Sequence, residues 1–545
     1  MNDQSLWYKN AVFYEIYVRA FYDSNGDGHG DLCGLTEKLD YLQELGVDCI
    51  WLLPIYPSPL LDDGYDIADY YGILNSYGTV EDFKALLDAA HQRGMRVITD
   101  LVLNHTSDQH PWFQSARTSR DDPYRQFYVW SDTDQRYQDA RIIFVDTERS
   151  NWTWSEPTRQ FYWHRFYSSQ PDLNYDNPAV QEEMLQVARF WLDMGVDGFR
   201  ADAVPYLFER EGTNCENLPE THAYLKRLRR FVDKQYPGKI LLCEANQWPE
   251  DVRHYFGDGD EFHMGFHFPV MPRIFMALRQ GDVSPLVWIM QRTPSIPGDC
   301  QWCVFLRNHD ELTLEMVTEE ERQWMWKEYA PDMRMRLNLG IRRRLAPLLD
   351  NDRRKIEVAN SLLFTLPGSP TIYYGDEIGM GDNIELFDRN GVRTPMQWDS
   401  SPGGGFSVLP ADQCYAPVIQ REPYGPEWIN VASQQKDPGS LWNALRRMIQ
   451  LRKGHPALGW GDFTWTDIGT SAVAAYWRTY HDERLLILNN LSDLQQDISL
   501  RLPQQGLNPV IDLYSEKLVE VGQSGNIEFS LEPYQFLWLK TGEAA

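Results

Sequence analysis

The sequence lacks long apolar segments and has an excess of acidic over basic residues. No stretch of about 18 apolar residues occurs, so no membrane span is predicted. The first residues lack the basic start, apolar run and small-residue cleavage site of a signal peptide, and we therefore expect a cytoplasmic protein. The 79 Asp and Glu outnumber the 51 Lys and Arg, giving a net charge of −28, which argues against binding to nucleic acid or to anionic membranes.

Cysteine is also scarce, and its distribution argues against two kinds of scaffold. The seven cysteines are odd in number and widely spaced, which does not suggest a disulfide framework. Cys300 and Cys303 form a C-x-x-C pair, but no second pair of ligands follows at the spacing of a zinc site. Aromatic residues, in contrast, are abundant, with 20 Trp, 29 Tyr and 24 Phe. Many must belong to a core, but flat rings also stack on sugars and line the clefts that hold them.

Short β-rich runs alternate with helical patterns along most of the chain. The eight runs begin at Val12, Val47, Arg96, Val196, Lys239, Met264, Trp302 and Thr371. Between them lie helical segments such as 78–94 and 177–195, each closed by a glycine. Strand–helix alternation repeated eight times predicts an α/β fold of the (β/α)8 TIM-barrel type.

Two segments do not fit a simple barrel, and the end of the chain has a different pattern. The 66 residues between the third strand and the next helix, 106–171, are too many for a loop and predict an inserted subdomain. A second, strongly charged gap at 311–344 is expected to be helical. From about residue 456, short alternating segments predict a C-terminal antiparallel β-sandwich. The expected organisation is therefore barrel (1–105), inserted subdomain (106–171), barrel (172–455) and β-sandwich (456–545).

Three acids, Asp202, Glu244 and Asp310, each stand at the end of a different predicted strand. The carboxyl ends of barrel strands form the active face, and a pair of carboxylates is the usual machinery for cleaving a glycosidic bond. In "GFRADAVPY", Arg200 shares a strand face with Asp202 and is expected to hold it as the anion. Glu244 stands among apolar residues that raise its pKa, so we predict Asp202 as nucleophile and Glu244 as acid. The alternative is a set of structural ion pairs, which is disfavoured because all three acids stand at strand ends, with His105 and His309 in matching positions.

The same stretches carry a family resemblance. "DLVLNH", "GFRADAVPY", "LLCEAN", "FLRNHDE" and "QPDLN" resemble the conserved regions of the α-amylase family, glycoside hydrolase family 13, in order and in spacing. The resemblance implies that Asp202 is the nucleophile, Glu244 the general acid/base and Asp310 the acid that grips sugar hydroxyls. The other residues that it places around the bound glucose are His105, Arg200 and His309.

Two further motifs, "DDGYDIADY" and "GVRTPMQWD", resemble the oligo-1,6-glucosidase branch of this family. The resemblance implies that Asp62 and Arg393 close the pocket behind a non-reducing glucose, with Tyr65 as the stacking ring. The alternative for Arg393 is an ordinary surface arginine, because loops after the eighth strand vary.

The residues alone leave the reaction open. If water attacks the covalent glucosyl-enzyme, the protein is an α-glucosidase; if the released glucose is retained and attacks through its anomeric hydroxyl, maltose becomes trehalose. The choice depends on how well the pocket excludes water. Longer stretches, such as "GTNCENLPETHAYLKRLR" and "LWYKNAVFYEIYVRAF", resemble the branch that interconverts maltose and trehalose.

That resemblance implies an isomerase with minor hydrolysis to glucose. Asn246 and Gln247, just past the acid, are candidates for holding the free glucose. The expected partner is a small disaccharide, no organic cofactor is expected, and a homo-oligomer (dimer or tetramer) is expected because family members often form one. A non-enzymatic, transporter-associated relative is the alternative from another class, but such proteins usually lack the acids and carry a span that this chain lacks.

Two structural calcium sites are also expected. "DSNGDGHGD" places oxygen ligands at alternate positions, and similar loops in the oligo-1,6-glucosidase branch bind calcium or magnesium. Its ligands would be the side chains of Asp23, Asn25, Asp27 and Asp31 with the carbonyl of His29. The alternative is a solvated acidic turn. Family resemblance implies a second calcium between barrel and inserted subdomain, held by Asn104, Asp172, Glu209 and the carbonyls of Tyr206 and Leu207.

Overall fold

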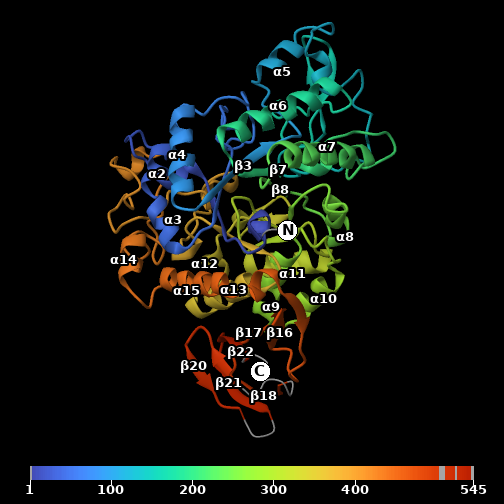
Figure 1. Cartoon of the computed structure of the whole chain (residues 1–545). Helices are drawn as coiled ribbons and strands as arrows, with labels where there is room; N and C mark the ends of the chain where they lie inside the picture. The colour runs from blue at the N-terminus through green and yellow to red at the C-terminus, as the bar shows by residue number, and fades with distance from the viewer. Residues whose placement is uncertain (1–2, 503–509, 522–524, 542–545) are drawn as a thin grey trace.

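The computed structural model describes residues 3–502, 510–521 and 525–541 and contains a closed barrel of eight parallel strands (Figure 1). In barrel order these strands are β1 (Phe13–Ile16), β14 (Ser369–Tyr373), β10 (Gln301–Phe305), β9 (Met264–Phe266), β8 (Ile240–Cys243), β7 (Gly198–Asp202), β3 (Arg96–Val102) and β2 (Cys49–Leu52). All eight predicted runs form these strands, so the predicted TIM barrel is confirmed. Nearly every strand residue is buried, as expected when helices cover the outside of a parallel barrel.

Helices surround the barrel, and their ends follow from local sequence. The longer ones are α3 (Leu39–Leu45), α4 (Val80–Gln92), α6 (Pro178–Met194), α7 (Pro219–Gln235), α9 (Val270–Gln280), α10 (Ser284–Arg292), α13 (Arg353–Thr365) and α15 (Leu441–Gly454). Thr79 and Asp82 form a capping box that starts α4. Gly195 ends α6 with φ 119°, a left-handed conformation that favours glycine. Within the described residues, no helix combines the length and the apolar composition needed to cross a membrane.

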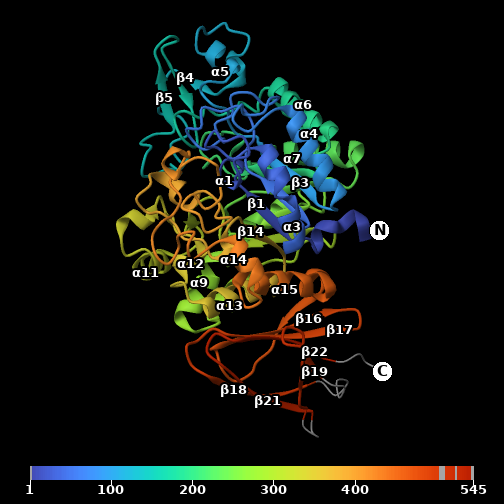
Figure 2. The same ribbon diagram turned by 90° about the vertical axis from the view of Figure 1, so that its left-hand side faces the viewer.

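The inserted segment folds over the carboxyl end of the barrel. It contains α5 (Pro111–Ala116) and a three-stranded sheet of β4 (Trp130–Ser131), β6 (Gln160–Trp163) and β5 (Trp152–Ser155). Trp152 and Trp163 lie in a small separate core that also includes Cys215, from outside the insertion. A bridge between His105 and Asp172 joins the two ends of the insertion at the barrel. Figures 1 and 2 place this subdomain at the opposite end of the molecule from the last strands of the chain.

The charged segment 311–344 is only partly helical. It contains one α-helix, α11 (Glu319–Tyr329), a short 3-10 turn (Met333–Met335) and a small antiparallel sheet of β11 (Leu312–Thr313), β13 (Gly340–Ile341) and β12 (Arg336–Leu337). The expectation of a helical segment was therefore wrong for its ends. Asn338, with φ 47°, makes the turn between β12 and β13, and asparagine tolerates this left-handed conformation better than most residues.

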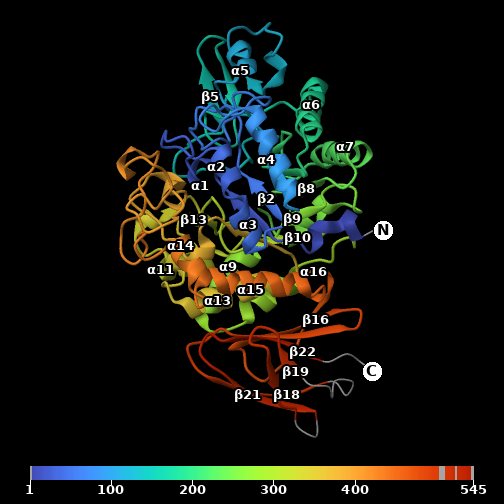
Figure 3. The ribbon, with the colours of Figure 1, turned by 60° about the vertical axis from the view of Figure 1, so that its left-hand side comes forward.

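The last strands form two antiparallel sheets around a shared core. The larger sheet is β15 (Asp462–Trp465), β16 (Val473–Tyr480), β17 (Glu483–Asn490), β22 (Phe536–Thr541), β19 (Val510–Asp512) and β20 (Lys517–Val519); the smaller is β18 (Gln496–Arg501) and β21 (Asn526–Leu531). Leu486 of the first sheet and Ile498 of the second belong to one apolar cluster, as predicted for a sandwich. Trp538 binds Ser361 of α13, so this domain sits on the barrel helices (Figure 3).

Candidate active site

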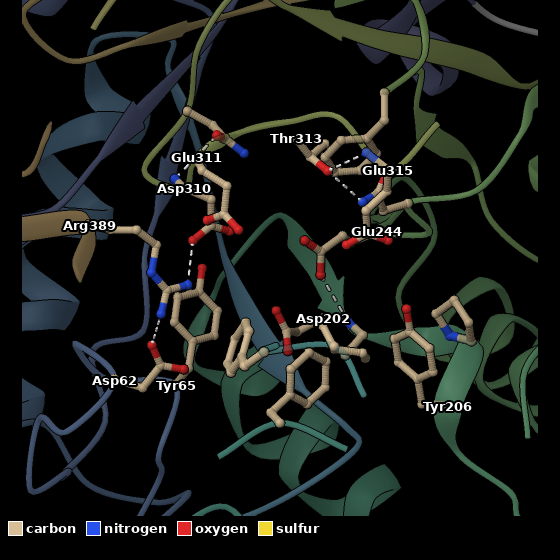
Figure 4. A pocket seen from close by; sticks show the side chains of 18 of the residues that line it. Asp62, Tyr65, Asp202, Tyr206, Glu244, Asp310, Glu311, Thr313, Glu315 and Arg389 are labelled. Carbon is tan, nitrogen blue, oxygen red and sulfur yellow. Dashed lines mark hydrogen bonds and ion pairs between the residues drawn. The ribbon is translucent and has the colours of Figure 1, made fainter. Parts of the chain in front are cut away.

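One buried guanidinium organises the centre of the pocket at the carboxyl end of the barrel. Arg200, on β7, is 1% exposed and forms ion pairs with Asp202, with Glu244 (2.6 Å from Nη2 to Oε1) and with Asp100 on β3 (2.5 Å). The backbone amide of Ala203 donates to the other oxygen of Glu244, at 3.0 Å (Figure 4). Two carboxylates that share one guanidinium lie within a few ångströms of each other, and both face the pocket. Retaining glycosidases need such a pair about 5–5.5 Å apart.

The environment separates the protonation states of the two carboxylates. Burial raises the pKa of Asp202 to about 6, although the charge of Arg200 opposes the rise. Burial raises the pKa of Glu244 further, to about 8, against Arg200 and with help from the negative charge of Asp202. Arg200 therefore limits the rise in the pKa of Asp202, in line with its expected role of holding this carboxylate as the anion. At neutral pH the arrangement still favours ionised Asp202 and protonated Glu244, which are the states of a nucleophile and an acid.

Asp310 and Asp62 lie together on one side of the pocket, joined by Arg389, which was not among the predicted site residues. Arg389 pairs with Asp62 at 2.5 Å and with Asp310 at 2.8 Å. Burial alone would raise the pKa of Asp310, but the positive charges of Arg389, Arg393 and Arg200 oppose this effect and that pKa is lowered. Figure 4 shows Asp62, Arg389 and Asp310 following one another along this wall.

Arg393 occupies a different place from the one expected. The structure pairs Asp62 with Arg389, and Arg393 lies behind the wall, paired with Asp63 at 2.5 Å and with Asp310 at 3.1 Å. Both arginines belong to "RNGVR" around a short 3-10 turn, Asp388–Val392, so the path of the loop decides which of them reaches the pocket.

The predicted aromatic and histidine residues divide between the wall and the layer behind it. Tyr65 and His105 line the pocket. The ring of Tyr65 stacks on His309 with centroids 5.3 Å apart and planes at 11°, so His309 lies behind the tyrosine. Burial lowers the pKa of His105 to about 3, which keeps this ring neutral. A neutral imidazole can offer both a donor and an acceptor to sugar hydroxyls.

The opposite wall holds the residues that follow the acid. Asn246 lines the pocket and donates to Thr313 of β11 at 3.2 Å. We had expected Gln247 to line the pocket, but it does not. Its amide instead donates to Glu216 at 2.9 Å, behind the wall. Successive residues point in different directions after β8, so only one of the two faces the substrate space.

An ion-pair network completes this wall and was not predicted. Arg141, from the inserted subdomain, binds Glu315 at 2.6 Å, Glu216 at 2.8 Å and the hydroxyl of Tyr206 at 3.2 Å. Tyr206 and Glu315 line the pocket, with the rings of Phe144 and Phe166 between the walls. The network ties the insertion to the segment after β10, and Figure 4 places Tyr206 and Glu315 across the pocket from Asp62.

The residues expected at the second calcium site share an unusual property. Oδ1 of Asn104, Oδ2 of Asp172 and Oε1 of Glu209 are buried and have no hydrogen-bond partner. Burial raises the pKa of Asp172 to about 8, and burial together with the charge of Asp172 raises that of Glu209 well above its usual range. Unsatisfied buried oxygens are costly, and a hard cation such as Ca²⁺ prefers this donor set, so the residues fit the ion.

In the 23–31 loop, in contrast, carboxylates already accept hydrogen bonds from the backbone. The carboxylate of Asp23 accepts the amides of Gly26 at 2.7 Å and Gly28 at 2.8 Å, and Asp31 accepts the amide of Ser24 at 2.8 Å. Asn25 and Asp27 lie nearer the surface. Across the described parts of the chain, no three His, Cys, Asp or Glu side chains surround a common point suited to a metal ion. Calcium or magnesium at this loop stays a prediction.

A parallel barrel with paired carboxylates at its carboxyl end defines an enzyme that acts on glycosidic bonds. The family model "Alpha amylase, catalytic domain" matches residues 15–461, and "Maltogenic Amylase, C-terminal domain" matches residues 463–538. The chain belongs to the α-amylase family.

Individual relatives narrow the comparison. The trehalose synthase/amylase TreS of Mycolicibacterium smegmatis is 58% identical over 551 residues, covering 98% of this chain and 93% of that protein. The trehalose synthase of Pimelobacter sp. is 56% identical over 556 residues, covering 99% of this chain and 96% of that one. The crystal structure of the trehalulose synthase MutB from Pseudomonas mesoacidophila matches with a TM-score of 0.79 at 29% identity, covering 98% and 99% of the two chains. The resemblance to the sugar-isomerising branch is thereby confirmed.

Proposed function

We propose that this enzyme interconverts maltose and trehalose by moving a glucosyl group within one bound pair of sugars. The observation that carries the proposal is the wall that Arg141 closes with Glu216, Glu315 and Tyr206, because a freed glucose must be kept in the pocket away from water. The names of relatives that are 56% and 58% identical support the same reaction.

The chemistry follows from the protonation states. Glu244 donates its proton to the glycosidic oxygen of maltose while ionised Asp202 attacks the anomeric carbon, giving a covalent glucosyl-enzyme and a free glucose. The free glucose turns until its own anomeric hydroxyl faces the intermediate. Glu244, now the base, takes the proton of that hydroxyl, and the oxygen displaces Asp202. Two inversions leave an α,α-1,1 linkage. Water in place of the glucose gives hydrolysis as the minor reaction.

The two walls have separate tasks in this scheme. Arg389, Asp62 and Asp310 would hold the hydroxyls of the transferred glucose, since charged groups fixed by one another form strong and directional hydrogen bonds. Asn246, which lines the opposite wall, would bind a hydroxyl of the moving glucose. We further propose that Ca²⁺ bound by Asn104, Asp172 and Glu209, with the carbonyls of Tyr206 and Leu207, holds the insertion on the barrel; its role there is structural.

Product analysis tests the proposal. Purified enzyme is incubated with maltose and an equal concentration of [13C]glucose, and the products are followed by NMR. We expect unlabelled trehalose to form, with little glucose released and little label in the trehalose. Glucose as the sole product would instead make the protein an α-glucosidase. Heavily labelled trehalose would mean that the acceptor glucose exchanges with solution, contrary to an intramolecular transfer.

A further inference from the structure

Glu15 is a buried acid that the scheme above does not use. It lies on β1, is 0% exposed and pairs in register with Tyr373 of β14. His309 follows β10, the strand on the other side of β14, and the two side chains meet inside the barrel. Oε1 of Glu15 is 3.2 Å from the backbone nitrogen of His309 and 2.5 Å from Nδ1 of its ring. The other oxygen, Oε2, is buried without a partner.

These contacts determine where the ring of His309 carries its proton. Burial raises the pKa of Glu15 well above its usual range, so the position of any proton on this acid matters. Oε1 already accepts the backbone N–H of His309 while Oε2 has no partner, which places such a proton on Oε2 and leaves Oε1 as the acceptor and Nδ1 beside it as the donor. Burial lowers the pKa of His309 well below its usual range, so the ring is neutral and has a single N–H. Nε2 then carries a lone pair and accepts from the hydroxyl of Tyr65, 2.9 Å away.

The choice of tautomer matters because Nε2 also faces Asp310, with Oδ2 at 3.3 Å. Oδ1 of Asp310 is already bound by Arg389 at 2.8 Å and Arg393 at 3.1 Å. In the other tautomer Nε2–H would donate to Oδ2 and occupy the remaining oxygen of this carboxylate. With the proton on Nδ1, Oδ2 stays open to a donor from the pocket, which Asp310 lines.

We infer that Glu15 is a positioning residue: by holding the proton of His309 on Nδ1, it keeps Oδ2 of Asp310 available for a substrate hydroxyl and directs the Tyr65 hydroxyl away from the sugar. The inference rests on the proposed function only in naming a sugar as the occupant. The tautomer itself is a property of the free enzyme, which separates the two claims.

The tautomer is measured first, in the unmodified protein. Long-range ¹H–¹⁵N correlation NMR on enzyme with ¹⁵N-labelled histidine distinguishes a protonated from an unprotonated ring nitrogen, and His309→Asn identifies the signal among the 12 histidines. We expect protonated Nδ1 and unprotonated Nε2. A protonated Nε2 in the free enzyme would overturn the inference, whatever reaction the enzyme catalyses.

Two variants of similar size then test whether Glu15 acts as a hydrogen-bond acceptor or only fills space in the core. Glu15→Gln keeps an acceptor oxygen, and we expect the same tautomer and a kcat/KM within about twofold of the parent. Glu15→Met removes the acceptor; the proton should move to Nε2 and kcat/KM for maltose consumption should fall by about tenfold to hundredfold. Equal losses in both variants, or an unchanged tautomer in Glu15→Met, would refute the role. If Glu15→Met does not fold, the spectra of the parent and of Glu15→Gln still decide.

Discussion

The dependence of turnover on pH tests the roles of Asp202 and Glu244 directly. Burial raises the pKa of the nucleophile to about 6 and that of the acid to about 8. Activity needs the first group ionised and the second protonated, so kcat/KM should rise with pH up to about 6 and fall above about 8. At pH 5 roughly a tenth of Asp202 is ionised, and at pH 9 roughly a tenth of Glu244 is protonated. We therefore expect kcat/KM to be about tenfold lower at both extremes than at pH 7.

The assay follows maltose loss and trehalose gain by NMR at constant ionic strength, well below KM. Samples held at each pH and returned to pH 7 must recover full activity, which separates titration from unfolding. Because the two carboxylates interact, the apparent pKa values read from the two limbs of the pH profile belong to the pair rather than to each residue alone.

The variant Asp100→Asn tests the electrostatic origin of the acidic limb. The negative charge of Asp100 contributes to the raised pKa of Asp202 through their shared arginine, so Asp100→Asn should move the acidic limb to lower pH. Glu81→Gln, on the exposed side of α4, should leave both limbs in place. A flat profile between pH 5 and 9, or an acidic limb that moves upward in Asp100→Asn, would refute the electrostatic reasoning.

Three further outcomes are expected. Arg389→Ala leaves Asp62 and Asp310 without this partner, and breaking a buried ion pair costs about 3–5 kcal/mol. Both Tm and kcat/KM should therefore fall steeply. Unchanged kinetics would contradict the role of these three residues in holding the transferred glucose. Arg141→Ala should raise the share of glucose among the products by admitting water, and an unchanged glucose-to-trehalose ratio would show that the network is no barrier. EDTA should lower Tm and Ca²⁺ should restore it, with about 2.7 kcal/mol of stabilisation when Ca²⁺ is at a hundred times its Kd. Asp172→Asn should abolish this response. A Tm that neither EDTA nor Ca²⁺ changes would count against the ion.

The barrel and its three acids could be predicted because both depend on short-range patterns. Each strand is a compact apolar run, and each acid lies at or shortly after the end of one: Asp202 ends β7, Glu244 follows β8, and Asp310 lies five residues past β10. The strands therefore bring all three to the carboxyl end of the barrel. Asn246, two residues past Glu244, was predicted because it lies so close to the acid in sequence.

The rest of the site depends on contacts between distant parts of the chain. Arg141 and Glu315 are 174 residues apart, and neither belongs to a recognisable pattern. Arg389 and Arg393 are four residues apart in one loop, so local sequence did not distinguish the one that enters the pocket. The short sheet around Asn338 was missed because two-residue strands carry too few positions to show alternation.

The position of the last domain has a practical consequence. All three ribbon views place the sheets of β16 to β22 at one end of the molecule and the inserted subdomain at the other (Figures 1 to 3). Coupling the enzyme to a bead or electrode through exposed residues of β20, such as Lys517, would leave the sugar entrance turned toward the bulk liquid. Immobilised preparations made that way should keep the Michaelis constant of the free enzyme, whereas coupling through the opposite end should not.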